Sequence, residues 1–138
     1  MAFRSNPSCY LAIPSDPEFA PVRQAVVEAL TELNVEPAEA DDATRSSRLG
    51  SLEHADFVIA DVTGPSRWVL WELGYAYASR KPVLILSQER SEVPPELGKS
   101  QVILYSIEQI PELGEYVRYW IKTMIRAQRS RYEPVVNL

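Results

Sequence analysis

Short apolar runs alternate along this chain with segments in which apolar residues recur every three or four positions. The apolar runs occupy residues 9–13 (CYLAI), 56–61 (DFVIAD), 83–86 (VLIL) and 101–105 (QVILY), while 35–43 (VEPAEADDA) holds a weaker one followed by an acidic loop. The segments with helical spacing lie at residues 17–34, 46–53, 66–82 and 116–125. Apolar runs of this length predict buried strands, and the spacing of three to four predicts amphipathic helices.

The order of these elements predicts the fold. Continuous apolar strands that alternate with helices are typical of a parallel sheet covered by helices on both faces. We therefore predict an α/β domain of the flavodoxin-like class, a three-layer sandwich around a five-stranded parallel sheet. The domain is predicted to span residues 1–128, with a polar C-terminal tail at 129–138. Such sheets bind ligands outside the carboxyl ends of their strands, so segments 14–16, 61–66 and 87–89 are expected to meet there.

Composition and charge narrow the range of functions. A chain of 138 residues with 46% hydrophobic residues and a net charge of −5 is typical of one soluble domain. The negative charge argues against non-specific binding to nucleic acid or to an anionic membrane surface. No apolar run is long enough to cross a membrane, and the first residues resemble no signal peptide, so we expect a cytoplasmic protein. Cys9 and His54 are the single cysteine and histidine, which leaves little material for a Cys/His metal site.

The third predicted helix contains a carboxyl group in an apolar setting. Between Trp68 and Ala78, Glu72 is the only charged residue. Transfer of an unpaired carboxylate out of water costs several kcal/mol, so chance is a poor explanation for a carboxylate at this place. Either a nearby cation such as Arg67 or Arg80 pairs with Glu72 in the core, or Glu72 lines a cleft and acts there.

The residues around Glu72 are those that a nucleotide pocket needs. Trp68 lies one helical turn before Glu72, and Ser66 lies near the helix N-terminus, where free backbone N–H groups favour an anion. The aromatic ring can stack on a base, and the carboxylate can face the anomeric carbon of a ribose. Loss of a base from ribose passes through an oxocarbenium-like state, which a nearby carboxylate stabilises or traps covalently.

Three further residues belong to the predicted pocket because of their place in the topology. Asp61 ends the third strand and either contributes to the pocket or caps the following helix. Ser15 and Asp16 follow the first strand, so they are expected at the same edge of the sheet. The candidate site thus consists of Glu72 as catalytic residue, with the remaining members binding substrate: Ser66, Trp68, Asp61, Ser15 and Asp16.

The sequence ADFVIADVTGPSRWVLWELGYAYASRKPVLIL, residues 55–86, carries a resemblance to a known group. In that group an apolar strand ends in Asp, a short loop follows, and a helix carries Glu-Leu-Gly-x-Ala before Lys-Pro and the next strand. The segment resembles the nucleoside 2-deoxyribosyltransferase-like and Toll/interleukin-1-receptor-like (TIR-like) group of flavodoxin-fold domains. The opening strand and helix are also similar to the group's, so the resemblance spans roughly residues 8–125.

One branch of the group implies cleavage of NAD⁺. TIR-type NAD⁺-cleaving domains place their catalytic Glu in a Trp-x-x-x-Glu arrangement, which Trp68 and Glu72 match. The resemblance implies an NAD⁺ glycohydrolase or cyclase in which Glu72 acts at the nicotinamide-bearing ribose and Trp68 shapes the wall beside the base. Ser66 and Asp61 would hold ribose or phosphate oxygens. NAD⁺ would be a consumed substrate, and no metal or other cofactor is required. This branch is the leading hypothesis, with bacterial anti-phage defence as the implied role.

The other branch contains nucleoside 2-deoxyribosyltransferases and deoxynucleotide N-hydrolases. Val62-Thr63-x-Pro65-Ser66 and Glu72-Leu73-Gly74-x-Ala76 resemble its motifs, which implies that Ser66 binds phosphate and Glu72 attacks the anomeric carbon. Two departures count against a monophosphate substrate. The loop at residues 12–16 lacks the glycines and the arginine that cradle a 5′-phosphate in that branch, and Arg48 stands about where a substrate-orienting Asp is expected. An unphosphorylated nucleoside is compatible with both departures.

The resemblance also bears on partners and on rival functions. A small-molecule nucleotide is the implied substrate, and we expect a homo-oligomer or an assembly with a sensor or effector protein. A non-catalytic TIR-like interaction module is the main rival, although such a module has no chemical need for Glu72. A phosphoacceptor receiver domain shares the fold, but residues 13–15 (IPS) and 105–107 (YSI) lack the acidic pair and the lysine that it needs.

Overall fold

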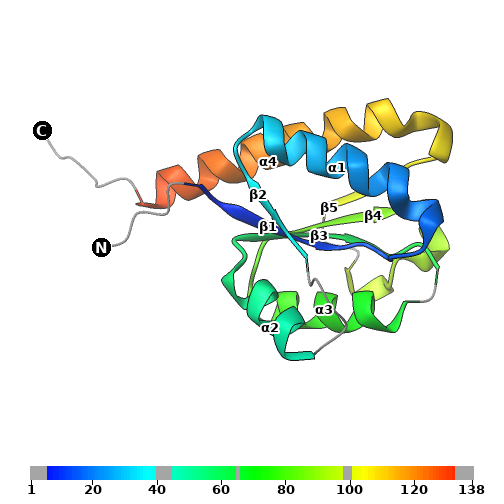
Figure 1. Ribbon diagram of the computed structural model, residues 1–138, viewed down its shortest axis with the longest axis horizontal. Coiled ribbons are helices and arrows are strands. Elements are labelled where there is room, and N and C mark those ends of the chain that lie inside the picture. The colour runs from blue at the N-terminus through cyan, green and yellow to red at the C-terminus, as the bar shows by residue number, and fades with distance from the viewer. Residues whose placement is uncertain (1–5, 40–44, 65, 98–100, 133–138) are drawn as a thin grey trace, which may run out of the picture.

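Five parallel strands form the sheet at the centre of the computed structural model (Figure 1). The strands are β1 (Ser8–Ala12), β2 (Glu36–Ala38), β3 (Phe57–Asp61), β4 (Val83–Ser87) and β5 (Gln101–Leu104). Their order across the sheet is β2-β1-β3-β4-β5, and every neighbouring pair is parallel. The predicted flavodoxin-like α/β fold with a five-stranded parallel sheet is confirmed.

The structure describes residues 6–39, 45–64, 66–97 and 101–132, with the backbone alone at residues 45–48, 96 and 129–132. Two positions named in the sequence analysis, Pro65 and the side chain of Arg48, lie outside the described residues. Most of the acidic segment after β2 does so as well.

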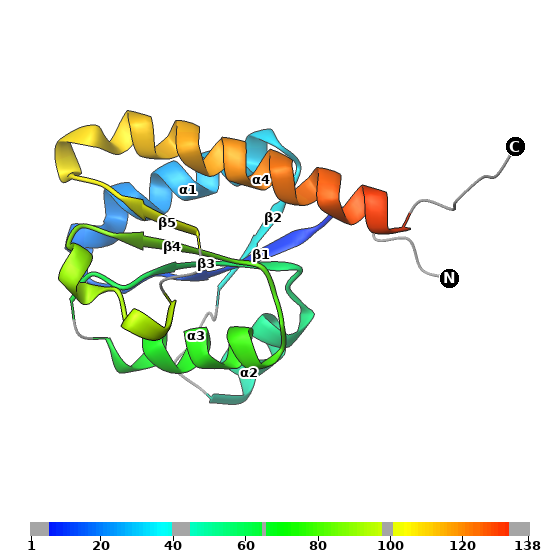
Figure 2. The same cartoon turned by 180° about the vertical axis from the view of Figure 1, so that it is seen from behind.

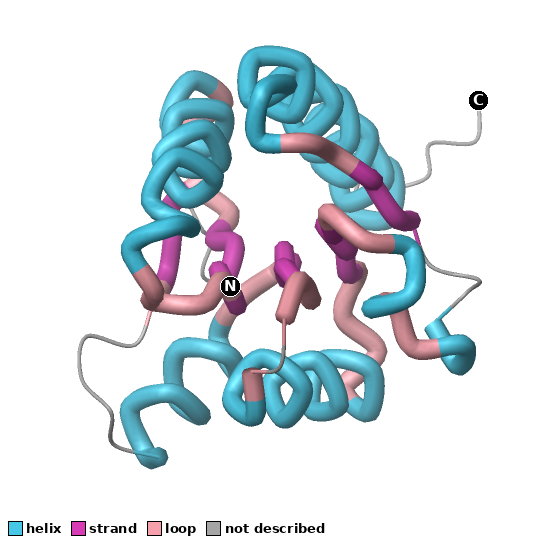
Figure 3. The backbone as a smooth tube through the Cα atoms, turned by 90° about the vertical axis from the view of Figure 1, so that its right-hand side faces the viewer, coloured by secondary structure: helices cyan, strands magenta, loops and turns pink. Residues whose placement is uncertain are grey.

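Two helices cover each face of the sheet. Helices α1 (Ala20–Glu32) and α4 (Ile110–Tyr132) lie on one face, and α2 (Arg45–His54) and α3 (Arg67–Ala78) lie on the other (Figures 1 and 3). The view from behind shows the same arrangement, with the C-terminal part of α4 extending past the edge of the layers (Figure 2). Within the described residues, no helix combines the length and the apolar character needed to cross a membrane.

Alternation along β1 assigns each of its side chains to one of two cores. Cys9 and Leu11 pack with α1 and α4, whereas Tyr10 and Ala12 pack with α2 and α3. This follows from strand geometry, because successive side chains point to opposite faces of the sheet. Tyr10 is therefore directed toward the layer that contains α3.

The strand order places a switch point between β1 and β3. From β1 the chain moves outward to β2, and it then returns to β3 and continues in the opposite direction through β4 and β5. The loops that leave β1 and β3 consequently diverge to opposite faces of the sheet, which opens a crevice at the carboxyl ends of these two strands. This is the edge at which the sequence predicted the ligand site.

The last helix is longer than its apolar spacing predicted. The pattern indicated a helix over 116–125, but α4 begins at Ile110 and continues to Tyr132. The polar first turn carries Pro111 and Glu112. Proline is favourable there because the first N–H groups of a helix have no acceptor within the helix, so its missing N–H costs no hydrogen bond. At the other end, residues 129–132 of the predicted tail continue the helix, and residues 133–138 lie outside the described part.

Lys81 links the two helices on the α3 face of the sheet. Lys81 follows α3, and its Nζ donates hydrogen bonds to the backbone carbonyls of Glu53 (3.0 Å) and Ala55 (2.7 Å), at the end of α2. A cation at a helix C-terminus satisfies carbonyl groups that have no partner within the helix.

Replacement of Lys81 by Met is expected to lower the free energy of unfolding by about 1–2 kcal/mol, because two carbonyl groups lose a charged donor. Urea denaturation measures this change as a lower midpoint with an unchanged slope. Lys122→Met, on the exposed face of α4, serves as the matched control. Equal midpoints for the two variants would contradict a role for Lys81 in holding α2.

Candidate active site

The turn between β3 and α3 determines how α3 presents its side chains. Gly64 has a positive φ of 76°, a conformation that glycine adopts without strain. Ser66 then caps the helix, because its Oγ accepts a hydrogen bond from the backbone N–H of Val69 (3.3 Å). From this start, the buried face of α3 consists of Val69, Glu72, Leu73 and Ala76. Glu72 therefore projects toward the sheet.

Glu72 is buried and hydrogen-bonded to the neighbouring strand. Only 2% of its surface is exposed, and its Oε2 accepts a hydrogen bond from the hydroxyl of Tyr10 in β1. Tyr10 is itself buried, so the contact lies in the apolar layer between the sheet and α3. A buried carboxyl group is tolerated only with hydrogen-bonding partners, and Tyr10 provides one. Tyr10 was not among the predicted site residues, because a tyrosine in an apolar strand gives no signal beyond that of a core residue.

A cavity of about 240 Å³ lies beside this pair. Its lining comes from β1, the loop after β1, α1, the residue after β2, and α3: Tyr10, Leu11, Ile13, Ser15, Arg23, Glu39 and Glu72. These segments meet at the carboxyl ends of β1 and β2, next to the switch point. Glu72 thus has both properties that a working carboxylate needs, burial and contact with a space that a ligand can enter.

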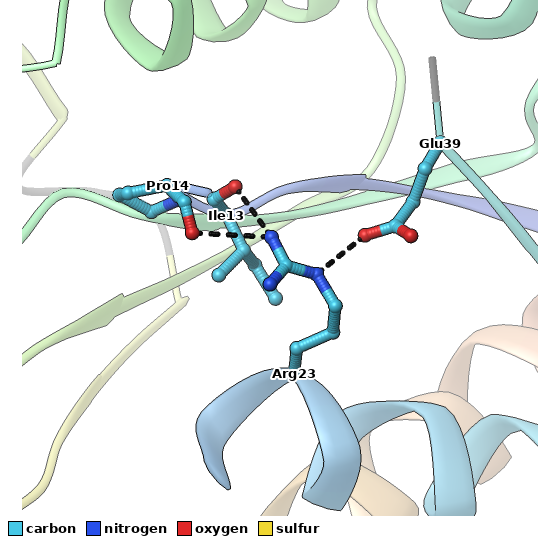
Figure 4. Close-up of polar contacts among 4 residues, drawn as sticks. All are labelled: Ile13, Pro14, Arg23 and Glu39. Carbon is cyan, nitrogen blue, oxygen red and sulfur yellow. Dashed lines mark hydrogen bonds and ion pairs between the residues drawn. The ribbon is translucent and has the colours of Figure 1, made fainter. Parts of the chain in front are cut away.

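A guanidinium group forms part of the same cavity wall (Figure 4). Arg23 extends from α1 to the end of β1, where its Nη2 donates to the carbonyl oxygens of Ile13 (3.0 Å) and Pro14 (3.1 Å). Its Nε donates to Oε1 of Glu39 at 2.7 Å. The sequence analysis missed both charged residues. Their signal was the position of Arg23 near the start of α1 and of Glu39 directly after β2, which places both at the ligand edge of the sheet.

The predicted substrate-binding residues divide into two groups. Ser15 lines the cavity together with Glu72. Asp16, Ser66, Trp68 and Asp61 are not among the described residues that line it. Asp16 is exposed where the short helical turn at residues 17–19 begins. The substrate-binding role of all five residues stays a prediction.

Trp68 does not share the environment of Glu72, although the two are four residues apart. Its side chain is 42% exposed, and its ring packs edge-on against Trp71 with a centroid distance of 6.3 Å. Trp71 in turn stacks on Tyr75. Trp68 lies in the first turn of α3, and its ring contacts the next turn of the same helix through Trp71.

Asp61 organises the neighbouring loops from within the protein. Its Oδ1 accepts from the backbone N–H of Thr63 (2.9 Å), and its Oδ2 accepts from the hydroxyl of Tyr105 (2.5 Å). The amide of Gln88 donates to the same tyrosine hydroxyl, and its backbone N–H donates to Thr63. Burial raises the pKa of Asp61, although the bonds from Tyr105 and Thr63 act in the opposite direction. Asp61 therefore ties the loops after β3 and β4 to the end of β5.

A family model for nucleoside 2-deoxyribosyltransferase matches residues 11–128. This chain belongs to the nucleoside 2-deoxyribosyltransferase family. The match includes the whole of β3, α3 and the ends of β1 and β2, so it contains every residue of the cavity lining except Tyr10. Of the two branches in the resemblance, the comparison supports the one that contains the deoxyribosyltransferases.

This chain also resembles individual proteins, either in the sequence of one part of the chain or in the fold. It is 42% identical over 62 residues to 5-hydroxymethyl-dUMP N-hydrolase of Rattus norvegicus, a match that covers 45% of this chain and 38% of that relative. The structure resembles CMP N-glycosidase of Clostridium botulinum with a TM-score of 0.60 and 19% identity, covering 83% of this chain and 98% of that one. It also resembles 2-deoxyribosyltransferase of Bacillus psychrosaccharolyticus, with a TM-score of 0.58 and 17% identity over 75% and 95% of the two chains.

These comparisons support chemistry at the N-glycosidic bond of a nucleoside or nucleotide. The two structural likenesses show the fold alone, because both fall below 25% identity. The TIR-like branch, NAD⁺ as substrate and a role in anti-phage defence stay predictions. The same holds for the absence of a cofactor and for the homo-oligomer or sensor assembly.

The raised pKa of Asp61 makes stability depend on pH in a defined direction. A carboxyl group that binds its proton more tightly in the folded protein contributes stability at low pH, and this contribution is lost as pH rises through the folded pKa. The free energy of unfolding of the wild type, relative to Asp61→Asn, is therefore expected to fall as pH rises above the ordinary pKa of an aspartate, about 4. Denaturation at a series of pH values measures the difference.

Tyr105→Phe provides the companion measurement. Its hydroxyl lowers the pKa of Asp61, so its removal should move the pH-dependent loss of stability to higher pH. A wild type that gains stability over Asp61→Asn as pH rises would contradict this account of the buried carboxyl group.

Proposed function

We propose that this protein breaks the N-glycosidic bond of a 2′-deoxyribonucleoside or 2′-deoxyribonucleotide, with Glu72 as its catalytic carboxylate. One observation carries the proposal: the carboxyl group of Glu72 is buried, accepts a hydrogen bond from Tyr10 and lines a cavity at the ligand edge of the sheet. Membership of the nucleoside 2-deoxyribosyltransferase family supports the same class of bond.

The geometry supports a two-step reaction at the sugar. A carboxylate oxygen of Glu72 approaches C1′ while the electron pair of the C1′–N bond leaves with the base, which takes a proton from solvent. The resulting glycosyl ester is opened by water, which gives the free sugar, or by a second base, which gives a new nucleoside. A fixed negative group beside the sugar also stabilises its oxocarbenium-like transition state.

Tyr10 is positioned to direct this carboxylate. Its hydroxyl donates to Oε2 of Glu72, which orients the carboxyl plane relative to the cavity. A donor to the charged form also stabilises that form against protonation. Ser15 supplies a hydroxyl group on the cavity wall and is a candidate partner for a sugar hydroxyl. Ser66, Trp68, Asp61 and Asp16 would act, if they touch substrate, on the part that extends beyond the cavity.

The size of the cavity favours a nucleoside over NAD⁺ as the ligand. At about 240 Å³ it is smaller than most ligand sites, which enclose roughly 300–1,000 Å³, and it suits a sugar with its base better than a dinucleotide. A rival function as a non-catalytic interaction module gives no reason to bury a carboxyl group beside such a space. An assembly of several copies remains compatible with the proposal and stays a prediction.

The first test compares the wild type with Glu72→Gln on a panel of 2′-deoxynucleosides, their 5′-monophosphates and NAD⁺. We expect base release from a deoxyribosyl substrate and a loss of about a thousand-fold or more in the variant, because the amide cannot capture the sugar cation. Chromatography of the released base measures both rates. Glu115→Gln, on the exposed face of α4, is the matched control.

Three outcomes would contradict the proposal. Glu72→Gln with near wild-type activity would remove the carboxylate from the mechanism. Release of nicotinamide from NAD⁺, with no base released from any deoxyribosyl compound, would favour the TIR-type reaction. A wild type that is inert throughout the panel, even at high protein concentration, would favour an interaction module.

Tyr10→Phe tests the role of the hydroxyl group separately. Loss of a charge-assisted hydrogen bond, worth about 1.5–3 kcal/mol, is expected to lower kcat roughly ten- to a hundred-fold. The acidic limb of the kcat/KM profile should also move to higher pH, because the donor that favours the carboxylate is gone. Tyr116→Phe, on α4, is the control. A pH profile of kcat/KM that does not move would show that Tyr10 contributes packing alone and no hydrogen bond that matters for catalysis.

A further inference from the structure

We propose that the Arg23–Glu39 ion pair makes the cavity selective for an unphosphorylated deoxynucleoside over its 5′-monophosphate. This inference rests on the proposed function, since it assumes that the cavity beside Glu72 receives the sugar. The inference concerns the charge of the cavity wall on which Arg23 and Glu39 lie. It assigns a role in substrate specificity to Glu39, which follows directly after β2.

The two charged walls of the cavity come from opposite faces of the sheet. Glu72 enters from α3, whereas Arg23 enters from α1 and meets Glu39 at the ends of β1 and β2 (Figure 4). A sugar with its C1′ against Glu72 would share this cavity with Arg23 and Glu39, within which its hydroxyl groups would have to find partners. Among the described residues of the lining, the charged groups are two carboxyl groups and one guanidinium.

The guanidinium of Arg23 is already engaged by acceptors of the protein. Its Nε donates to Glu39 at 2.7 Å, and its Nη2 donates to the carbonyl oxygens of Ile13 and Pro14 at 3.0 and 3.1 Å. This set fixes the guanidinium plane and compensates its charge. Among the described residues, no hydrogen bond uses Nη1, so a phosphate group could approach Arg23 there, but with the carboxylate of Glu39 bonded to the same guanidinium.

The hydrogen-bonding capacity of Glu39 separates a hydroxyl group from a phosphate. An ionised carboxylate only accepts hydrogen bonds, so it can receive the proton of a 5′-hydroxyl group. A phosphate at neutral pH is also an acceptor and carries about two negative charges, so it can only repel Glu39. The side chains of Arg23 and Glu39 are 27% and 40% exposed, which places the pair at the rim, where a substrate substituent would reach it.

Binding of matched ligand pairs tests this inference independently of turnover. Each deoxynucleoside and its 5′-monophosphate is titrated by calorimetry into protein carrying Glu72→Gln, so that the ligand is not consumed. We expect the nucleoside to bind more tightly than its monophosphate. Adding Glu39→Gln should shift the ratio of the two Kd values toward the monophosphate by about tenfold or more, because Arg23 is released from its carboxylate.

Two further variants make the result specific. Glu36→Gln removes the same charge from an exposed position of β2 and should leave the ratio unchanged. Arg23→Gln combined with Glu39→Gln should abolish the shift of the Kd ratio toward the monophosphate, because the cation that would receive the phosphate is absent. The shift should also decrease at high salt, since the pair is partly exposed. Circular dichroism confirms that each variant is folded.

The outcomes separate this inference from the proposed function. A monophosphate that binds more tightly than its nucleoside before any change at Glu39, or a ratio that Glu39→Gln leaves unchanged, would overturn the inference alone. The expected ratios together with a wild type that releases no base would overturn the proposed catalysis alone. Failure of both ligands to bind would overturn both.

Discussion

The hydrogen bond between Tyr10 and Glu72 is the contact on which the candidate site depends. It joins β1 to α3 within the apolar layer on one face of the sheet, where both side chains are almost fully buried. A carboxyl group without partners would cost several kcal/mol at such a place. The alternation of β1, which turns Tyr10 toward α3, therefore decides both whether Glu72 can be buried and how its oxygens face the cavity.

A second polar network holds the remainder of the ligand edge in place. Asp61 bonds to Thr63 and Tyr105, and Gln88 bonds to Thr63 and Tyr105, so the ends of β3, β4 and β5 are connected through side chains. Asp61 has the position of a substrate ligand in the topology, but both of its carboxylate oxygens already bond within the protein. Its contribution to a reaction would be to keep the turn before α3, and with it the orientation of Glu72, constant.

The sequence was sufficient to predict the fold and the central carboxylate. Periodicity located most of the elements, because β1, β3, β4 and β5 coincide with apolar runs, whereas β2 (Glu36–Ala38) was only weakly indicated and α4 proved longer than its apolar spacing. Glu72 stood out because it is the only charged residue in the apolar segment between Trp68 and Ala78. Tyr10 could not be found in this way, since an apolar strand accepts a tyrosine as readily as a leucine, and only the fold shows which face of the sheet it joins. The spacing that set Trp68 beside Glu72 did not show that its ring is 42% exposed and packs on Trp71, and its role toward a substrate stays a prediction.

The comparisons support the family resemblance for the class of bond and leave the substrate open, and the site offers a physical reason. A buried carboxylate on α3 serves any sugar cation, so the residues that carry the resemblance describe what is common to all such enzymes. In the proposed selectivity, the opposite wall of the cavity discriminates between substrates. There Arg23 and Glu39, which are 16 residues apart in the chain, form an ion pair. Neither residue belongs to a motif, and their effect depends on their pairing: the same arginine with a neutral neighbour would offer a phosphate site. The proposed substrate preference therefore depends on an ion pair that only the folded chain creates.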